Sequence, residues 1–318
     1  MIFSKICAKL FSSANQKARP VFLTILFLLS SLLILLLPRP QHAQDDEVVR
    51  VNTDLVVLNI TITDQRGAYV RHLTRSNFQI FEDARPQDIT TFSVEETPFA
   101  AAILLDTSGS MEGRMTLARS AAIRFLDGLR AEDTAAVYRF DSRVEQIQDF
   151  SSSRDLAPLA FGMRAEGMTV LNDAVARAAR DIALRPEKRR AIIVLSDGAD
   201  TQSKLTPDKA IGSAIAVGAS VYTVDMSDPQ TAPDKRHLAA GALRAFANKT
   251  GGRYISTPGG RALRDAFASI VDELSNQYTI GYQPTNRARD GRWRAIEVRL
   301  TTSDKTVRTR PGYRAPKS

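Results

Sequence analysis

The chain has 318 residues and a formal net charge of +8, with 43% hydrophobic and 25% charged residues. These fractions suit a globular protein that buries a substantial core. Five basic residues and no acidic one precede Asp45, so the remainder carries only about +3. Because no basic run is interleaved with aromatic residues, we exclude nucleic acid as an expected partner.

An uncharged apolar run fills residues 21–37 and follows a basic stretch, which predicts an export signal. Its length of about 17 residues lies between a long signal-peptide core and a short spanning helix. Two outcomes stay open for residues 1–44: cleavage near Ala43 or a retained membrane anchor. Either way, the positive charges stay inside, so we expect a periplasmic, cell-surface or secreted protein. We expect membrane contact only through this segment.

The sole cysteine, Cys7, precedes the apolar run. The exported part therefore has no thiol and no disulfide, although its compartment can be oxidising. Its stability must come from the hydrophobic core, which is feasible at this size.

Residues 45–97 have the apolar alternation of strands. Apolar residues recur near every second position over 48–63, and strand-like stretches follow at 78–81 and 89–94. Turn-forming residues separate these stretches. We therefore expect a small all-β region before residue 98.

In residues 98–276, strands alternate with helices of ten or more residues. This alternation predicts crossover connections, a mostly parallel sheet and helices on both faces, which is a Rossmann-like α/β domain. The expected strands are 99–105, 135–140, 144–148, 191–195, 220–224 and 253–255, and the expected helices are 114–129, 171–184, 207–217, 235–249 and 261–275.

The last part, residues 277–318, is strand-like again, with expected strands at 278–282, 293–301 and 306–310. No helix intervenes, so these strands do not extend the α/β layer. We expect them to pair with residues 45–97 in one β-sandwich, with the α/β domain inserted between. The alternative is two separate β appendages.

Oxygen-bearing side chains gather where the expected strands of the α/β domain end. The pentapeptide from Asp106 to Ser110, which includes Ser108, follows the first strand; Thr169 precedes a helix, and Asp197 follows the strand 191–195. The carboxyl ends of parallel strands form the ligand-binding edge of such sheets. Hard divalent cations such as Mg²⁺ prefer oxygen ligands, so the pattern suggests an incomplete metal cage. Each residue alone could equally be a helix cap or a turn.

The same residues argue against an enzyme. An aspartic protease would need glycine where Ser108 stands, and a dehalogenase-type phosphatase would need an acid there. The Gly-x-Ser-x-Gly elbow of many hydrolases is absent from the sequence. Outside the N-terminal segment the only histidines are His72 and His237, which makes a histidine base or zinc site improbable. We therefore expect a binding protein.

Taken together, the three motifs resemble the metal-ion-dependent adhesion site of von Willebrand factor type A domains, over about residues 97–275. The motifs are Asp106-x-Ser108-x-Ser110, Gly167-x-Thr169 and Asp197-Gly198. The flanks are similar to bacterial proteins of this family described in Acidobacteria, through the stretches 78–83, 277–282 and 310–313.

The resemblance implies a role for each residue. Ser108 and Ser110 would bind Mg²⁺ directly, with Mn²⁺ or Ca²⁺ as alternatives, and Thr169 would bind it directly or through water. Asp106 and Asp197 would act through waters and by charge. An Asp or Glu side chain of a protein partner would complete the coordination. The implied function is adhesion by an exported protein; the alternative is a structural or membrane-tethered envelope protein that uses no metal. The oligomeric state stays open.

Overall fold

The computed structural model describes residues 55–317, except 95–96, 198–199, 229, 231 and 258. The apolar run 21–37, Ala43, Cys7 and Gly198 lie outside the described residues, as does the part of the first expected strand before Leu55. None of the helices in the described part combines the length and apolar character that crossing a bilayer requires.

The α/β domain is built on a six-stranded sheet with the strand order β10-β9-β8-β5-β6-β7. Neighbouring strands are parallel, except that β7 runs antiparallel to β6. The predicted mostly parallel α/β fold is therefore confirmed. The strands are β5 (Phe99–Asp106), β6 (Thr134–Phe140), β7 (Val144–Ser151), β8 (Arg189–Ser196), β9 (Ala219–Asp225) and β10 (Tyr254–Ser256).

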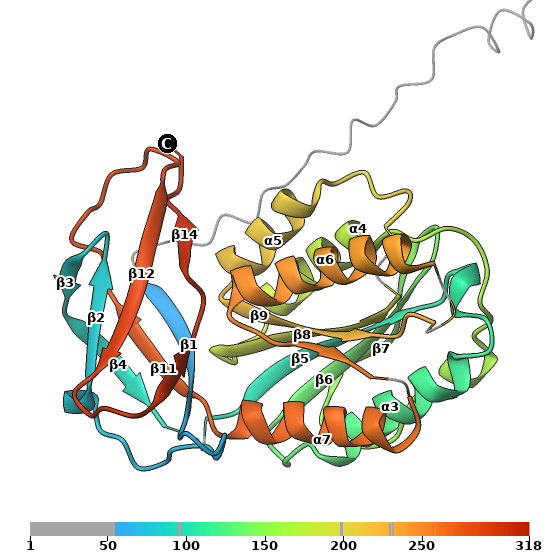
Figure 1. The fold of residues 1–318 in the computed structure, drawn as a ribbon, viewed down its shortest axis with the longest axis horizontal. Coiled ribbons are helices and arrows are strands. Elements are labelled where there is room, and N and C mark those ends of the chain that lie inside the picture. The colour runs from blue at the N-terminus through green and yellow to red at the C-terminus, as the bar shows by residue number, and fades with distance from the viewer. Residues whose placement is uncertain are drawn as a thin grey trace, which may run out of the picture. The chain divides into compact units, whose positions relative to one another are not determined.

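Helices cover both faces of this sheet (Figure 1). Helices α3 and α7 pack together on one face, and α4, α5 and α6 lie on the other. Two 3-10 turns, η2 (Gly109–Met111) and η3 (Pro158–Gly162), complete the domain. The helices are α3 (Met115–Asp127), α4 (Leu171–Ala183), α5 (Pro207–Ala216), α6 (Pro233–Thr250) and α7 (Gly260–Ser275).

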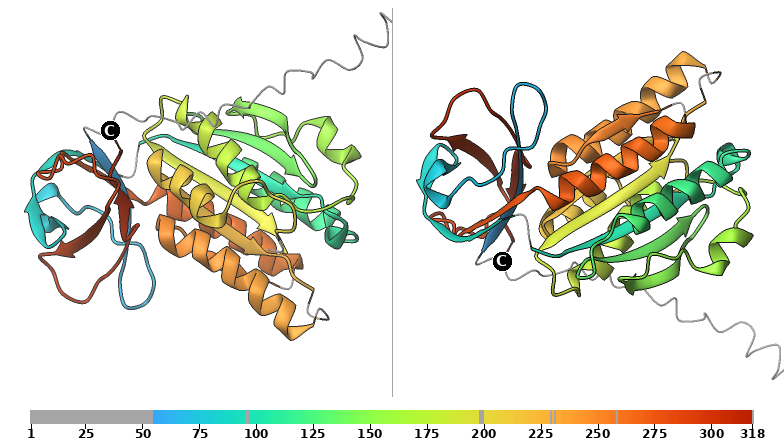
Figure 2. Two further views of the ribbon diagram at one scale, coloured as in Figure 1. Left: turned by 90° about the horizontal axis from the view of Figure 1, so that it is seen from above. Right: turned by 90° about the horizontal axis from the view of Figure 1, so that it is seen from below.

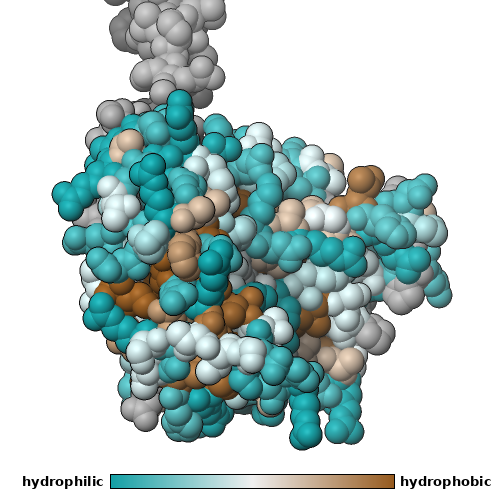
Figure 3. Space-filling view, turned by 60° about the vertical axis from the view of Figure 1, so that its left-hand side comes forward, coloured by the Kyte–Doolittle hydropathy of each residue, from teal (hydrophilic) through white to brown (hydrophobic). Residues whose placement is uncertain are grey.

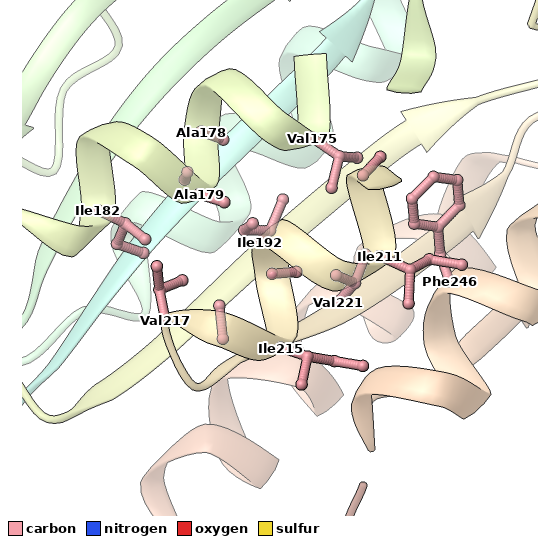
Figure 4. Packing of buried hydrophobic residues seen from close by; sticks show 14 of the residues in the cluster. Val175, Ala178, Ala179, Ile182, Ile192, Ile211, Ile215, Val217, Val221 and Phe246 are labelled. Carbon is pink, nitrogen blue, oxygen red and sulfur yellow. The ribbon is translucent and has the colours of Figure 1, made fainter. Parts of the chain in front are cut away.

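The core explains why β5 is apolar along almost its whole length. All eight of its residues are buried, as expected for a strand covered on both faces. Successive side chains alternate between two hydrophobic clusters, with Leu104 on the side of α4 and Leu105 on the side of α3. Figure 4 shows the first cluster, where Val175 of α4 and Ile211 of α5 pack near Ile192 of β8.

The flanking strands form two four-stranded antiparallel sheets, with the orders β13-β1-β11-β4 and β14-β12-β2-β3 (Figure 2). Each sheet combines strands from before and after the α/β domain, so the predicted β-sandwich is confirmed. The elements are β1 (Val56–Thr63), η1 (Arg75–Asn77), β2 (Phe78–Glu82), β3 (Arg85–Gln87), β4 (Ile89–Ser93), β11 (Tyr278–Tyr282), β12 (Trp293–Leu300), β13 (Thr306–Arg308) and β14 (Gly312–Arg314).

A buried carboxylate joins the sandwich to the α/β domain. Glu273, near the end of α7, has no exposed surface. Its Oε1 atom accepts hydrogen bonds from the Tyr222 hydroxyl at 2.6 Å and the Thr61 hydroxyl at 3.3 Å. The same oxygen lies 2.6 Å from the Arg308 guanidinium, and Oε2 lies 3.5 Å from Nε of Arg253. Burial raises the pKa of Tyr222, so its hydroxyl stays a donor. One side chain thus holds α7, β9, β1 and β13 together.

We expect Glu273→Ala to lower the free energy of unfolding by about 1–3 kcal/mol, because it leaves the buried hydroxyls of Tyr222 and Thr61 without their acceptor. Urea unfolding followed by circular dichroism measures this loss. Glu297→Ala is the control, because it removes an exposed carboxylate that pairs with Arg299 at 2.7 Å and should leave the unfolding midpoint unchanged. Equal losses in the two variants would contradict a special role for Glu273.

Candidate functional site

The predicted site residues lie where the strand order of the sheet reverses. The chain continues from β5 to β6 on one side, whereas β8 pairs with β5 on the other. The register places Leu105 beside Leu195, so Asp106, the last residue of β5, and Asp197, which follows β8, lie at the ends of neighbouring parallel strands, as predicted. Crevices at such reversal points are the usual ligand sites of open α/β sheets.

Asp106 is a fully buried carboxylate at the end of β5. Its Oδ1 atom accepts a hydrogen bond of 2.9 Å from the Ser108 amide, and its Oδ2 atom accepts one from the Ser196 hydroxyl. The pKa of Asp106 is raised to about 6, chiefly by burial and to a smaller extent by the charge of Asp197, while the hydrogen bonds from Ser108 and Ser196 oppose the rise. The carboxylate is therefore held in a fixed orientation in an environment that disfavours its charge.

The two predicted serine ligands lie side by side after β5. The hydroxyl of Ser108, which is 2% exposed, lies 3.1 Å from the hydroxyl of Ser110. The hydrogen bond from the Ser108 amide to Asp106 bends the chain into the turn η2, which gives this short spacing. Ser110 itself is exposed, so the pair of hydroxyls faces solvent on one side.

Backbone hydrogen bonds bring the loop that carries Thr169 against the serine turn. The Gly109 amide donates to the Gly167 carbonyl at 3.2 Å, and the Glu166 amide donates to the Thr107 carbonyl at 2.8 Å. Gly167 has a φ of 76°, and a Cβ atom there would lie 2.6 Å from the Ser142 hydroxyl. Glycine is therefore required for this close approach.

Thr169 is buried, and its amide donates to the Thr201 hydroxyl at 2.9 Å. Within the described residues, no hydrogen bond joins the Thr169 hydroxyl to Ser108 or Ser110. The structure therefore fixes the loop of Thr169 beside the serines through its backbone.

Asp197 follows β8 and carries an oxygen without a partner. Its Oδ1 atom is buried and accepts no hydrogen bond from the described residues, while its carbonyl accepts one from the Ser227 hydroxyl at 3.1 Å. A buried carboxylate oxygen is costly unless a donor or cation satisfies it. This oxygen is therefore available for a cation or for water.

The donor set fits a hard divalent cation. It combines two carboxylates that repel each other, a free carboxylate oxygen and two adjacent hydroxyls, all of which are oxygen ligands. No cluster of three or more His, Cys, Asp or Glu side chains with metal-binding geometry occurs in the described part of the chain. A cation at this site would therefore depend on hydroxyls as much as on carboxylates.

Ser196 is the site residue that the sequence analysis missed. It is the last residue of β8, it is fully buried, and its hydroxyl binds Asp106. The sequence shows that Ser196 precedes Asp197, but the hydrogen bond from Ser196 to Asp106 depends on the register between β5 and β8. His72 and His237 are both exposed, the first before η1 and the second in α6.

Residues 101–199 match the model of the von Willebrand factor type A domain. An uncharacterized protein of Synechocystis, sll0103, is 30% identical over 185 residues, which are 56% of this chain. The chain spans 42% of the length of that relative.

Solved structures with a similar fold include a von Willebrand factor type A protein from Catenulispora acidiphila. It is 15% identical, with a TM-score of 0.44, over 78% of this chain and 76% of that one. Another is the vWF domain of the type V pili tip protein Mfa5 from Porphyromonas gingivalis, at 13% identity and a TM-score of 0.46, over 56% and 94% of the chains. The resemblance to Acidobacteria proteins stays a prediction. Residues 101–199 of this chain are therefore similar to the von Willebrand factor type A domain.

Proposed function

We propose that the chain binds a divalent cation, with Mg²⁺ as the first candidate, through Asp106, Ser108, Ser110, Thr169 and Asp197. The observation that carries this proposal is the uncompensated negative charge at the site. Burial and Asp197 both disfavour ionisation of Asp106, and the Asp197 Oδ1 atom has no partner among the described residues. A bound cation offsets both costs at once.

The same donor set favours an external carboxylate as a further ligand. Ser108 and Ser110 are neutral direct ligands, and Asp106 and Asp197 would act through waters, so a cation bound by the hydroxyls can still attract a further carboxylate. Asp106 orients Ser108 through the backbone amide and Ser196 through its hydroxyl. When bound, the cation supplies a Lewis-acidic centre that attracts a carboxylate.

The rim of the site offers a surface for a protein partner. Ser110 is exposed, and the side chain of Met168 in the loop before Thr169 is 48% exposed. We therefore propose that this chain is an exported adhesion protein and that it binds an Asp or Glu side chain of a protein partner at this rim. A binding role is favoured over catalysis because both described histidines lie outside the site and no thiol is present in the described part of the chain.

In the full chain, we expect Ser108→Ala combined with Asp197→Asn to abolish stabilisation by Mg²⁺. Wild-type protein at a Mg²⁺ concentration of about 100 Kd should gain about 2.7 kcal/mol of stability. Thermal unfolding with and without Mg²⁺ measures the gain. The matched control combines Ser120→Ala with Asp265→Asn, which are exposed positions on α3 and α7, and should keep the full gain. Equal Mg²⁺ stabilisation in both double variants would exclude a metal site at these residues, and no stabilisation of wild type would favour the metal-independent structural role.

The affinity for Mg²⁺ should depend on pH through Asp106, whose pKa is about 6. In the metal-free protein, the raised pKa stabilises the folded state below the ordinary aspartate value of about 4, and this contribution is lost as the pH rises through about 6. Because a proton and the cation compete for the carboxylate, the affinity should be constant above this pH and fall about tenfold per pH unit below it. Isothermal titration calorimetry at several pH values tests this, and a constant affinity through pH 6 would contradict it.

A further inference from the structure

The sandwich has one end at which basic residues gather around an exposed tryptophan. At this end β11 finishes at Tyr282, and the loop 283–292 leads from it to β12. We call the residues Arg292, Trp293 and Lys317 the basic tip. The chain terminus marked C in Figure 1 lies beside it, near β12 and β14.

Backbone contacts hold the basic tip together. Trp293 is the cross-strand partner of Arg314, and the Ala315 amide donates to the Arg292 carbonyl at 2.8 Å. The side chain of Lys317 lies over Gly291, where a Cβ atom would meet its Cε at 2.5 Å. The indole of Trp293 lies over Gly312, where an added Cβ atom would lie 2.6 Å from the indole ring. Glycine at both positions therefore leaves room for these side chains.

The charge at this end is strongly positive. Residues 283–293 hold three arginines and one acid, Asp290, and residues 312–317 hold an arginine and a lysine but no acid. The Asp290 carboxylate forms an ion pair of 3.0 Å with the buried Arg294, so its negative charge mainly offsets the charge of Arg294. The Asp290 carboxylate lies 3.9 Å from Nε of Arg292, whose side chain is 83% exposed. Arg314 contributes less, because its charge also acts on Asp208 of α5, whose pKa is lowered mainly by the hydrogen bond from Lys249.

Trp293 gives the basic tip an apolar centre. The residue is 42% exposed, which leaves part of a large aromatic ring in water. Tryptophan is enriched at the headgroup level of membranes, and long basic side chains extend from there to lipid phosphates. We propose that the basic tip docks onto an anionic phospholipid surface, with Trp293 inserted at the headgroup level.

A surface fits this patch better than a small ligand does. Of two cavities in the sandwich, one is an open groove of 690 Å³ lined by η1, β2 and β3, on the side that Figure 3 brings forward, where apolar residues lie recessed among hydrophilic ones. The other, of 150 Å³, includes Glu82 and Asp83, which disfavour an anion. Neither is lined by residues of the basic tip.

The course of the chain supports a membrane as the source of the anionic groups. Val56, at the start of β1, pairs with Tyr282, so the described chain begins at the end of the sandwich from which the loop 283–292 departs. In the sequence, only residues 38–54 separate Leu55 from the apolar run 21–37. Even fully extended, 17 residues reach at most about 60 Å. If the apolar run is retained as an anchor, the basic tip lies within reach of the same bilayer. This contact goes beyond the expectation that only residues 21–37 meet the membrane.

The experiment uses the full chain in phosphatidylcholine vesicles with and without phosphatidylglycerol. Trp293 is the sole tryptophan, so its emission reports on the basic tip alone. We expect a shift to shorter wavelength and quenching by brominated lipids only in vesicles with phosphatidylglycerol, and both effects should weaken with salt. Each basic side chain near an anionic surface strengthens the docking equilibrium about fivefold. Arg292→Glu changes the charge by two, so it should lower the ratio of docked to free tips about 25-fold.

Arg264→Glu is the matched control, because it reverses the charge of an exposed arginine on α7. It should leave the quenching unchanged. Equal quenching in neutral and anionic vesicles, or equal effects of the two reversals, would overturn the proposal. A Trp293 shift with soluble polyglutamate but not with vesicles would also overturn it, and would assign the basic tip to a soluble polyanion.

Discussion

The architecture depends on the pairing of β1 with β11, two strands that flank the inserted α/β domain. Five residue pairs join them, from Val56 with Tyr282 to Ile60 with Tyr278. Contacts so distant in the sequence carry a large closure cost, which the compact α/β domain reduces by bringing its two ends together. β4, which leads into that domain, pairs with β11, which leads out of it. Folding of the α/β domain therefore favours completion of the sandwich, and Glu273 connects the two at their junction.

The candidate site depends on the central sheet of the α/β domain. The sheet places Asp106 in its interior, where water cannot stabilise the charge, and the next strand adds Asp197 beside it. Serine hydroxyls and amides stabilise part of this charge, but the Asp197 Oδ1 atom has no partner among the described residues. A positively charged ligand would complete the site, and this explains why we favour a cation as the centre of the interaction.

Much of the fold could be predicted because local patterns and tertiary structure agree. β5 is almost continuously apolar, which marks a strand buried on both faces, and α4 has an apolar stripe with helical spacing. β3 escaped prediction, because Arg85-Pro86-Gln87 has no apolar pattern. It pairs with β2 because Asp83 and Ala84 adopt positive φ angles and close a tight hairpin.

The candidate site was predictable in its residues but not in its contacts. Motif spacing located Asp106, Ser108 and Ser110, and the structure joins them by short hydrogen bonds. The contact between Ser196 and Asp106 could not be predicted, because it depends on the register of two strands that are 90 residues apart in the sequence. Likewise, the gathering of Arg292, Trp293 and Lys317 depends on the packing of the C-terminal residues onto the loop before β12.

The antiparallel pairing of β1 and β11 also determines how the molecule would carry mechanical force. Under the proposed adhesion function, with attachment through the residues before Leu55, tension acts between Leu55 and the α/β domain that precedes Tyr278. The starts of β1 and β11 lie at opposite ends of their shared ladder. Tension would therefore load all of its hydrogen bonds in shear at once. If the two strands were parallel, both starts would lie at the same end, and the hydrogen bonds would open one after another. Under load, the lifetime of the fold depends on its rate of unfolding, which shear loading slows.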